Sequence, residues 1–468
     1  MKALYKICAL ALAATLSACS GGEGGLTPPP TPPAVSDACS VSTQNQFVLD
    51  QMLVWYLWND RLPASVDLDA YASPEELLDF LTTFSPDDGT GNPVDRFSFL
   101  TTATSDQQFF GEGKFEGFGF SSSFESDDDW RLTRVFFDSP ANRGGLARGQ
   151  RIVALDGRGV AEIEADEGVF AYLDANDTVE FTMRPVGGSV DGSNDFPTAL
   201  SKDIVTIDPL PQSRVIDGSG GRKIGYIEFA TFISTANSGF ETIFANFNSE
   251  GVTEVIIDMR YNGGGLVSTA ELFSDYLGGR IASNLVFSRT EYNADRNDEF
   301  NPEDLIARFA RLGNSMDLTD LVIIATSGTA SASELVINGL DPHTRVTIVG
   351  DNTFGKPVGQ VGLELAGCDV LLRPTSFKTV NSLGEGDFFD GLPVDCPAAD
   401  DLDIPVGADN DPNLVAALTY LETGACPVTS VSGGAAKGGG VQASPGGRST
   451  GPRRAPGGPP WREFADAY

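Results

Sequence analysis

The sequence contains 468 residues, which is enough for two or three domains with a large hydrophobic core. Its 65 acidic and 31 basic residues give a formal net charge of −34, which argues against nucleic acid or an anionic lipid surface as a docking partner. The only histidine is His343, so a Ser-His-Asp hydrolase would have to be built around that one imidazole. The same shortage disfavours zinc, and we expect no metal and no other cofactor.

The first residues have the pattern of a targeting segment, which we assign to 1–18. Two lysines precede an apolar stretch at 7–16 that is too short to span a bilayer comfortably. The next residues, Leu-Ser-Ala-Cys at 16–19, resemble a bacterial lipobox, which implies cleavage before Cys19 and a lipid on its sulfur. A plain signal peptide is the alternative. The serine after Cys19 fits an outer-membrane address facing the periplasm, and the Gly/Pro-rich stretch 19–38 would be a flexible tether.

The next region, 39–110, is predicted to be helical. Ser-Pro-Glu-Glu at 73–76 has the pattern of a helix start, with a capping serine and proline in the first helical position. A second predicted helix carries apolar side chains at helical spacing, which favours packing on one face. These apolar residues are Leu49, Met52, Leu53, Tyr56 and Leu57.

Residues 111–200 carry a Gly-Phe-Gly-Phe motif followed by strand and turn patterns. An acidic turn and a strand at 131–137 come next, and then the segments Ser-Pro-Ala, Gly-Leu, Gly-Gln-Arg-Ile and Asp-Gly between 139 and 157. Together these segments look like a PDZ domain. That resemblance implies that loop N–H groups capture the terminal carboxylate of a peptide that adds as a strand to a sheet edge. The implied carboxylate-binding loop consists of Gly117, Phe118, Gly119 and Phe120.

The segment 201–426 has the alternating strand and helix patterns of an α/β core. A predicted strand at 224–229 precedes a helix with one apolar face, and a second buried strand at 255–260 ends in a glycine-rich loop. Glycines allow a backbone to approach a substrate closely and to present its N–H groups. A tight turn between strand and helix is the simpler interpretation of this loop. Phosphate binding is disfavoured because no Lys-Ser/Thr follows the glycines.

Two further predicted strands, 321–325 and 346–349, place chemically reactive residues at their ends. Ser331 follows the first strand and opens a predicted helix, where free N–H groups and the positive helix end favour a developing oxyanion. Lys356 lies in the loop after the second strand. If the two strands are parallel neighbours, both residues reach the same edge of one sheet. Taken singly, a serine and a lysine are more often a helix cap and a surface charge.

The spacing of these residues resembles the carboxyl-terminal processing peptidases, also called tail-specific proteases. The matching residues are Ser-Ala-Ser-Glu at 331–334, Phe-Gly-Lys at 354–356 and Gln360. The resemblance implies that Ser331 is the nucleophile, Lys356 the general base and Gln360 the residue that orients the lysine. A Ser-Lys pair requires no histidine. The proline after Lys356 is a departure, since a glycine commonly follows the lysine in this family.

The resemblance also covers the glycine-rich loop and the order of the regions. The strand and loop at 255–265 are similar to the family's Asp-Leu-Arg-x-Asn-x-Gly-Gly segment, which lines the active site. It implies one oxyanion donor in Gly263 or Gly264 and the other at the Ala332 N–H. A helical N-terminal piece, a PDZ domain and an α/β core occur in the family in this order. The resemblance therefore covers about 45–410.

These observations predict a multidomain α/β protein with a helical N-terminal region, a β-rich PDZ-like domain and a protease core with a mainly parallel sheet. We expect a lipid-anchored serine endopeptidase of the bacterial cell envelope, with substrates that are proteins or peptides with free C-termini. One alternative is a catalytically silent relative that binds peptides or apolar ligands on the same scaffold. Another is a structural lipoprotein with a PDZ adaptor. The tail, 427–468, is rich in glycine and proline and is predicted to be disordered.

Four cysteines remain if Cys8 is removed with the targeting segment and Cys19 carries the lipid. An oxidising envelope compartment favours disulfides between them, and three pairings are open. We favour one bond that closes an excursion after the Lys356 loop and a second that joins the two ends of the folded region. These expected pairs are Cys368–Cys396 and Cys39–Cys426.

Overall fold

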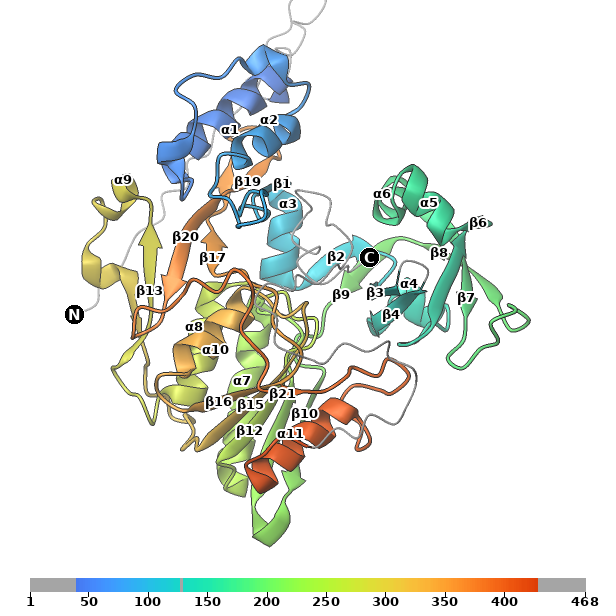
Figure 1. The fold of residues 1–468 in the computed structure, drawn as a ribbon, viewed down its shortest axis with the longest axis vertical. Coiled ribbons are helices and arrows are strands. Elements are labelled where there is room, and N and C mark those ends of the chain that lie inside the picture. Colours follow the sequence, from blue (N-terminus) through green and yellow to red (C-terminus); the bar gives the residue numbers. More distant parts are fainter. Residues whose placement is uncertain (1–38, 127–128, 428–468) are drawn as a thin grey trace, which may run out of the picture.

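The computed structural model describes residues 39–126 and 129–427. Within this part the chain forms an N-terminal region, a PDZ-like region and an α/β core, and the first two lie beside one end of the core (Figure 1). The predicted targeting segment, the tether, the lipidation residue Cys19 and the tail from residue 428 lie outside the described residues. Among the described helices, none combines the length and apolarity needed to cross a membrane.

The core contains a six-stranded sheet with the order β10-β11-β12-β15-β16-β21. Strand β10 is antiparallel to β11, whereas every pair from β11 to β21 is parallel. The central strands are nearly continuous runs of buried apolar residues because a parallel sheet is covered on both faces. The strands are β10 (Gln212–Asp217), β11 (Lys223–Glu228), β12 (Glu254–Asp258), β15 (Asp320–Ala325), β16 (Arg345–Gly350) and β21 (Cys396–Pro397).

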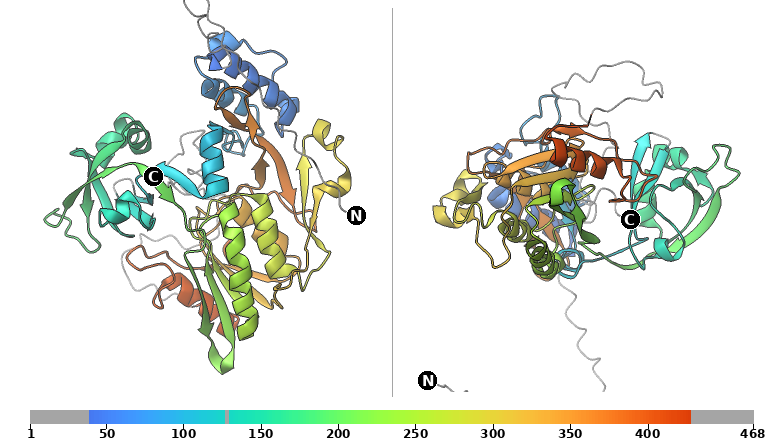
Figure 2. Two further views of the ribbon diagram at one scale, coloured as in Figure 1. Left: turned by 180° about the vertical axis from the view of Figure 1, so that it is seen from behind. Right: turned by 90° about the horizontal axis from the view of Figure 1, so that it is seen from below.

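Helices cover both faces of this sheet. Three of them lie on one face and α11 lies on the other, as the rear view shows (Figure 2). The first face is filled by aliphatic and aromatic side chains, and the aromatic ones include Phe240, Phe244 and Phe273, which are fully buried. Burying one such side chain contributes about 1.5–3 kcal/mol to folding. The helices are α7 (Asn237–Glu250), α8 (Val267–Gly278), α10 (Ala332–Leu340) and α11 (Pro412–Thr423).

Two smaller antiparallel sheets link the core to the N-terminal region. The first has the order β14-β13-β20-β17, and the second has the order β1-β19-β18. Strand β1 belongs to the region that we expected to be helical, yet it pairs with β19 of the core through Phe99 and Arg373. The strands are β1 (Phe99–Thr101), β13 (Val286–Tyr292), β14 (Ile306–Arg308), β17 (Val358–Gln360), β18 (Leu363–Glu364), β19 (Leu371–Arg373) and β20 (Thr375–Val380); short helical segments α9 (Ala294–Asn297) and η7 (Pro302–Leu305) follow β13.

The N-terminal region contains the predicted helices, but residues 83–98 form turns and irregular chain between them and β1. Helix α2 begins at Pro74, and the Ser73 hydroxyl accepts a hydrogen bond from the Glu76 N–H at 3.3 Å. Helix α1 ends at Trp55, so Tyr56 and Leu57, which the apolar spacing had placed on this helix, lie beyond its end. The segments are α1 (Val41–Trp55), η2 (Asn59–Arg61), η3 (Leu68–Ala70), α2 (Pro74–Thr82), α3 (Ala103–Asp106) and η4 (Gln107–Glu112).

The PDZ-like region is a five-stranded antiparallel path, β3-β4-β5-β7-β8, with β3 at one edge and β6 paired to β5. A separate pair, β2 and β9, joins the region to the rest of the chain. The elements are β2 (Lys114–Gly117), β3 (Phe120–Ser126), β4 (Asp129–Val135), α4 (Pro140–Arg143), β5 (Arg151–Leu155), β6 (Arg158–Gly159), α5 (Val160–Asp166), α6 (Val169–Ala175), β7 (Thr178–Arg184), β8 (Phe196–Ser201) and β9 (Asp203–Thr206).

Both predicted disulfide pairings are wrong, although all four cysteines are bridged. Cys39 pairs with Cys368, and Cys396 pairs with Cys426, with Cα–Cα distances of 5.4 and 5.2 Å. The excursion after the lysine loop does not close on itself: Cys368 lies in the turn between β18 and β19, beside the start of α1. Cys396 lies on the edge strand β21, and Cys426 follows α11, which packs on that side of the sheet.

Candidate active site

Ser331 occupies a strained turn between β15 and α10. Its backbone has φ 56° and ψ −114°, a conformation that an L-residue adopts only when the surrounding structure enforces it. The turn is held from both sides, because the Ala330 N–H donates to the Asn262 carbonyl at 2.9 Å and the Leu335 N–H donates to the Ser331 carbonyl at 2.8 Å. Ser331 itself is partly exposed, as a nucleophile must be.

Glu334 connects the serine turn to the lysine loop. Its fully buried carboxylate accepts from the N–H groups of Ser331 and Lys356 through one oxygen, at 2.9 and 2.8 Å. The other oxygen accepts from the Gly355 N–H at 2.8 Å and from the Thr353 hydroxyl at 2.5 Å. Burial raises the pKa of this carboxyl above its ordinary value, although the four donors oppose the shift. One carboxylate therefore fixes both backbones of the candidate catalytic pair.

The Lys356 side chain is buried next to polar and aromatic groups. Its residue is only 3% exposed, and its Nζ donates to the Gln360 Oε1 at 2.9 Å. The centre of the Phe97 ring lies 5.6 Å from the same nitrogen. Strands β15 and β16 are parallel neighbours, as the position of Ser331 and Lys356 at one sheet edge requires. The structure therefore places the Lys356 amine against Gln360, and Glu334 links the backbones of Ser331 and Lys356.

The glycine-rich loop after β12 packs directly against the serine turn. A Cβ on Gly264 would lie 2.7 Å from both the Ala332 nitrogen and the Ser331 Cβ, so only glycine fits there. The Gly264 N–H donates to the Asn262 Oδ1 at 2.9 Å and is already engaged. Within the described part of the chain, the N–H groups of Gly263 and Ala332 donate to no acceptor. Of the three predicted oxyanion donors, these two remain available.

Asn262 is a buried residue of this site that the sequence did not single out. Its side chain donates to the Phe229 carbonyl at 2.8 Å, and its own carbonyl accepts from the Ser333 hydroxyl at 3.0 Å. Together with the contact to the Ala330 N–H, these bonds tie the glycine loop to the serine turn. The sequence signal for this position was the asparagine of the Asp-Leu-Arg-x-Asn-x-Gly-Gly segment, which falls on Asn262, although that resemblance did not indicate these contacts. Glu334 also carried a sequence signal, because Ser-x-x-Glu is the pattern of a helix capping box.

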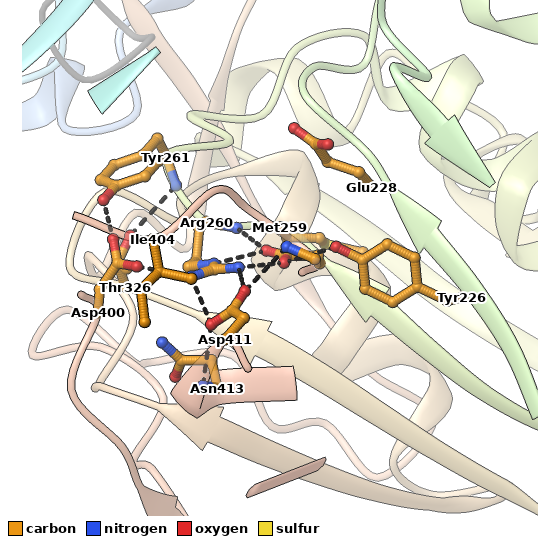
Figure 3. A network of polar contacts seen from close by, with 12 residues as sticks. Tyr226, Glu228, Met259, Arg260, Tyr261, Thr326, Asp400, Ile404, Asp411 and Asn413 are labelled. Carbon is orange, nitrogen blue, oxygen red and sulfur yellow. Dashed lines mark hydrogen bonds and ion pairs between the residues drawn. The ribbon is translucent and has the colours of Figure 1, made fainter. Parts of the chain in front are cut away.

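A buried charge network surrounds Arg260, which lies just before the glycine-rich loop in the sequence (Figure 3). The Arg260 guanidinium contacts the carboxylates of Asp258 at 2.6 Å, Asp400 at 2.6 Å and Asp411 at 2.5 Å. Burial alone would raise the pKa of Asp258, but Arg260 and its hydrogen bonds lower it overall. Arg148 of the PDZ-like region also contacts Asp400, at 2.7 Å. The network thus joins the start of the loop to the chain around 400–411 and to the PDZ-like region.

His343 lies outside the site. It follows the C-terminal end of α10, whereas Ser331 lies at the N-terminal end of the same helix. Its Nε2 is 2.9 Å from the Val286 carbonyl, and its ring packs edge-on against Phe309. The single imidazole is therefore a packing residue in this structure and is not within reach of Ser331.

The predicted carboxylate-binding loop connects β2 to β3. Phe118 and Phe120 are fully buried and pack against Phe181, with ring centres 5.3 and 5.7 Å away. Gly119 has φ +88°, and a Cβ there would lie 2.1 Å from the Ser139 Cβ. All four residues of the loop are buried, and the carbonyls of Phe118 and Gly119 accept from the N–H groups of Ala141 and Phe136, at 2.9 and 3.0 Å. The loop leads directly into the edge strand β3. This is the place at which a peptide strand could add to the sheet.

Two family models match the chain. Residues 223–394 match Peptidase family S41, and residues 43–99 match the Peptidase S41 N-terminal domain. The first range contains the serine turn, the lysine loop and the glycine loop. The second contains Phe97, whose ring lies near the Lys356 amine. Neither model covers residues 100–222, where the PDZ-like region lies.

Similar proteins include the chloroplastic C-terminal processing peptidase of Tetradesmus obliquus, which is 28% identical over 52% of this chain and 53% of its own length. Carboxyl-terminal-processing peptidase 3 of Arabidopsis thaliana is also 28% identical, over 47% of this chain and 41% of its own length. The chain therefore spans about half the length, or less, of these relatives. A solved structure from Bacteroides fragilis, described as an S41 protease, has a TM-score of 0.61 at 20% identity and covers 80% of this chain and 96% of its own, which shows a shared fold. With the site at 331–360 inside the matched range, the chain belongs to peptidase family S41.

Proposed function

We propose that the chain is a serine endopeptidase in which Ser331 and Lys356 form a catalytic dyad and Gln360 orients the lysine. The observation that carries this proposal is the shared contact of Glu334 with the backbone N–H groups of Ser331 and Lys356. This contact supports the assignment of Ser331 as nucleophile and Lys356 as base, because one buried carboxylate fixes both backbones. A helix-capping serine and an unrelated surface lysine would need no common buried carboxylate.

The residues suggest the following course of peptide hydrolysis. The Ser331 hydroxyl attacks the scissile carbonyl carbon while the uncharged Lys356 amine takes its proton. The N–H groups of Gly263 and Ala332 stabilise the oxyanion, and the ammonium then returns the proton to the leaving amine. Water, deprotonated by the same lysine, hydrolyses the acyl-serine ester and releases Ser331 as a hydroxyl.

Capture of the substrate would begin in the PDZ-like region. The loop at Gly117–Phe120 would bind the free carboxylate of a protein C-terminus, and β3 would pair with the captured strand. The position of β3 at the edge of its sheet supports this step, since an interior strand could not accept another partner. Substrates would then be proteins or peptides with free C-termini.

The cellular place of the protein is inferred from its first residues. A lipid on Cys19 would anchor the chain in the bacterial envelope. The predicted location is the outer membrane, with the protein facing the periplasm. Envelope proteins would then be the substrates. Two disulfides in the described region support an oxidising compartment. Metabolic labelling with a palmitate analogue should mark the wild-type protein and should not mark Cys19→Ser; equal labelling of both would contradict the anchor.

The catalytic proposal is tested with Ser331→Ala, Lys356→Ala and the double variant. Each single replacement should abolish cleavage of an unstructured peptide while thermal unfolding stays close to that of the wild type. The double variant should be little worse than either single one, because the two groups act as a unit. Near-normal turnover by Lys356→Ala would overturn the dyad, and binding of C-terminal peptides without any cleavage by the wild type would point to a silent binding protein.

A further inference from the structure

Gln360 is held in one orientation by a segment of the N-terminal region. Its Nε2 donates to the carbonyl oxygens of Phe97 and Arg373, at 2.5 and 3.2 Å. Because an amide nitrogen donates and an amide oxygen accepts, these two carbonyls determine which end of the amide faces the lysine. The oxygen is the end that remains for the Lys356 Nζ, at 2.9 Å. Without the two carbonyls, the amide could rotate and turn its nitrogen toward the amine.

The Phe97 carbonyl is in turn fixed by Asp95. This carboxylate is 4% exposed and accepts from the N–H groups of Phe97 and Ser98 through one oxygen, at 3.0 and 3.1 Å. The same oxygen accepts from the Thr375 hydroxyl at 2.9 Å, and the other accepts from the Ser98 hydroxyl at 2.6 Å. Thr375 begins β20, so Asp95 also clamps its segment to the core. Every one of these donors lies on Phe97, Ser98 or Thr375, and the carboxylate thereby sets the position of the Phe97 peptide.

We propose that Asp95 is a positioning residue for the lysine of the dyad, and that it acts through the Phe97 carbonyl and the Gln360 amide. The inference rests on the proposed function, because it assigns the N-terminal region a part in that reaction. The N-terminal region would then complete the active site and would be more than a packing partner of the core. Strand β1, which follows this segment and pairs with β19 next to Arg373, keeps the second carbonyl in register with the first.

The test is a double-mutant cycle between Asp95→Ala and Gln360→Ala, followed by the steady-state kinetics of peptide cleavage. Alone, Asp95→Ala should lower kcat by about 10–100-fold with little change in KM, because misplacement of a catalytic group by about 1 Å can cost 100-fold. In the Gln360→Ala background, the same change should lower kcat by less than about threefold, since the route through the amide is already lost. Asp69→Ala, at an exposed site of the same region, is the matched control and should be neutral.

Two milder variants keep the test decisive if Asp95→Ala fails to fold. Asp95→Asn retains one oxygen that can accept from both N–H groups and should recover most of the activity. Ser98→Ala removes the hydroxyl that donates to Asp95 and accepts from the Thr375 N–H at 2.9 Å, and it should lower kcat by about 3–10-fold. The proposal would be overturned if the losses in kcat from Asp95→Ala and Gln360→Ala multiplied in the double variant. It would also be overturned if Asp95→Ala changed only KM, or if a folded Asp95→Ala had wild-type kinetics. Failure of the proposed function is distinct: it would appear as activity in Ser331→Ala or Lys356→Ala.

Discussion

Replacement of Glu334 should disable the enzyme more than its distance from the substrate suggests. Glu334→Ala leaves three buried N–H groups, those of Ser331, Gly355 and Lys356, without their acceptor. Each unsatisfied buried donor costs about 1–3 kcal/mol, so the loops will shift to find other partners or water. A shift of about 1 Å between nucleophile and base costs about 100-fold in rate, which corresponds to about 2.7 kcal/mol in the barrier.

Glu334→Gln should be a milder change for a geometrical reason. The amide oxygen can still accept hydrogen bonds from the N–H groups of Ser331 and Lys356. The amide nitrogen then replaces the oxygen that faces Thr353 and Gly355. The Thr353 hydroxyl can rotate and accept from the amide nitrogen, but its own proton and the Gly355 N–H then lose this acceptor. We expect a loss of about 10-fold in kcat/KM, from these two donors and the lost charge. Activity should therefore decrease from the wild type to Glu334→Gln and from Glu334→Gln to Glu334→Ala.

The assay is single-turnover phosphonylation of the Ser331 hydroxyl by a serine-reactive phosphonate, together with steady-state peptide cleavage and thermal unfolding. Glu241→Ala, at an exposed position on α7, is the control and should behave as the wild type. Phosphonylation of Glu334→Ala at a near wild-type rate would refute the view that this carboxylate aligns the dyad. The same view would be refuted if Glu334→Ala lost activity only in proportion to the fraction of the protein that is unfolded.

The pH dependence of Glu334 separates activity from stability. Burial raises the pKa of its carboxyl, so the group takes up a proton at a higher pH in the folded protein than in the unfolded chain. Its contribution to the free energy of unfolding therefore increases as the pH falls through the folded pKa. A protonated carboxyl cannot accept from all four donors, and the dyad loses its alignment. Activity should thus fall on acidification before unfolding begins, and the fall should be fully reversible.

Three further results are expected. His343→Ala should remain active, because the imidazole lies at the far end of α10; a tenfold loss of kcat in the folded variant would reopen the choice of base. Amidation of a substrate's C-terminus should weaken its binding and slow its cleavage, and equal cleavage of both forms would remove the loop at Gly117–Phe120 from the mechanism. Burial raises the pKa of Asp275 to about 6, so its stabilising contribution is complete below pH 3.8 and is lost as the pH rises through 6. Asp275→Asn should therefore raise the unfolding temperature at pH 8 and leave it nearly unchanged at pH 3.5; a larger gain at the acidic pH would contradict this sign.

The local pattern of the sequence was sufficient to predict the elements that carry the dyad. Buried apolar runs predicted the strands, and the observed bounds differ from the prediction by one residue at one end of β15 and at both ends of β16. Parallel pairing of these two strands is what brings Ser331 and Lys356 to one edge. Glycine at 264 was foreseeable as a place of close approach, although the engagement of its N–H by Asn262 was not.

The contacts between distant segments could not be read from local pattern. Phe97 and Gln360 are 263 residues apart, and nothing near either one predicts that the first holds the second. The prediction of the disulfide pairings was wrong for the same reason. The pairing of Cys39 with Cys368 depends on how the N-terminal region docks on the β18–β19 turn. Strand β1 is too short for a periodic signal and is a strand only because β19 offers it an edge.

The dyad is tested most directly by mapping the phosphonate adduct by mass spectrometry and measuring the rate at which it forms. The wild type should carry one adduct, on the peptide that contains Ser331, and Ser331→Ala should carry none. Lys356→Ala should form the adduct at least about 100-fold more slowly with an unchanged unfolding temperature, because no base then removes the hydroxyl proton. An adduct on a different serine, or an unchanged rate in Lys356→Ala, would contradict the assignment of Ser331 and Lys356 as nucleophile and base.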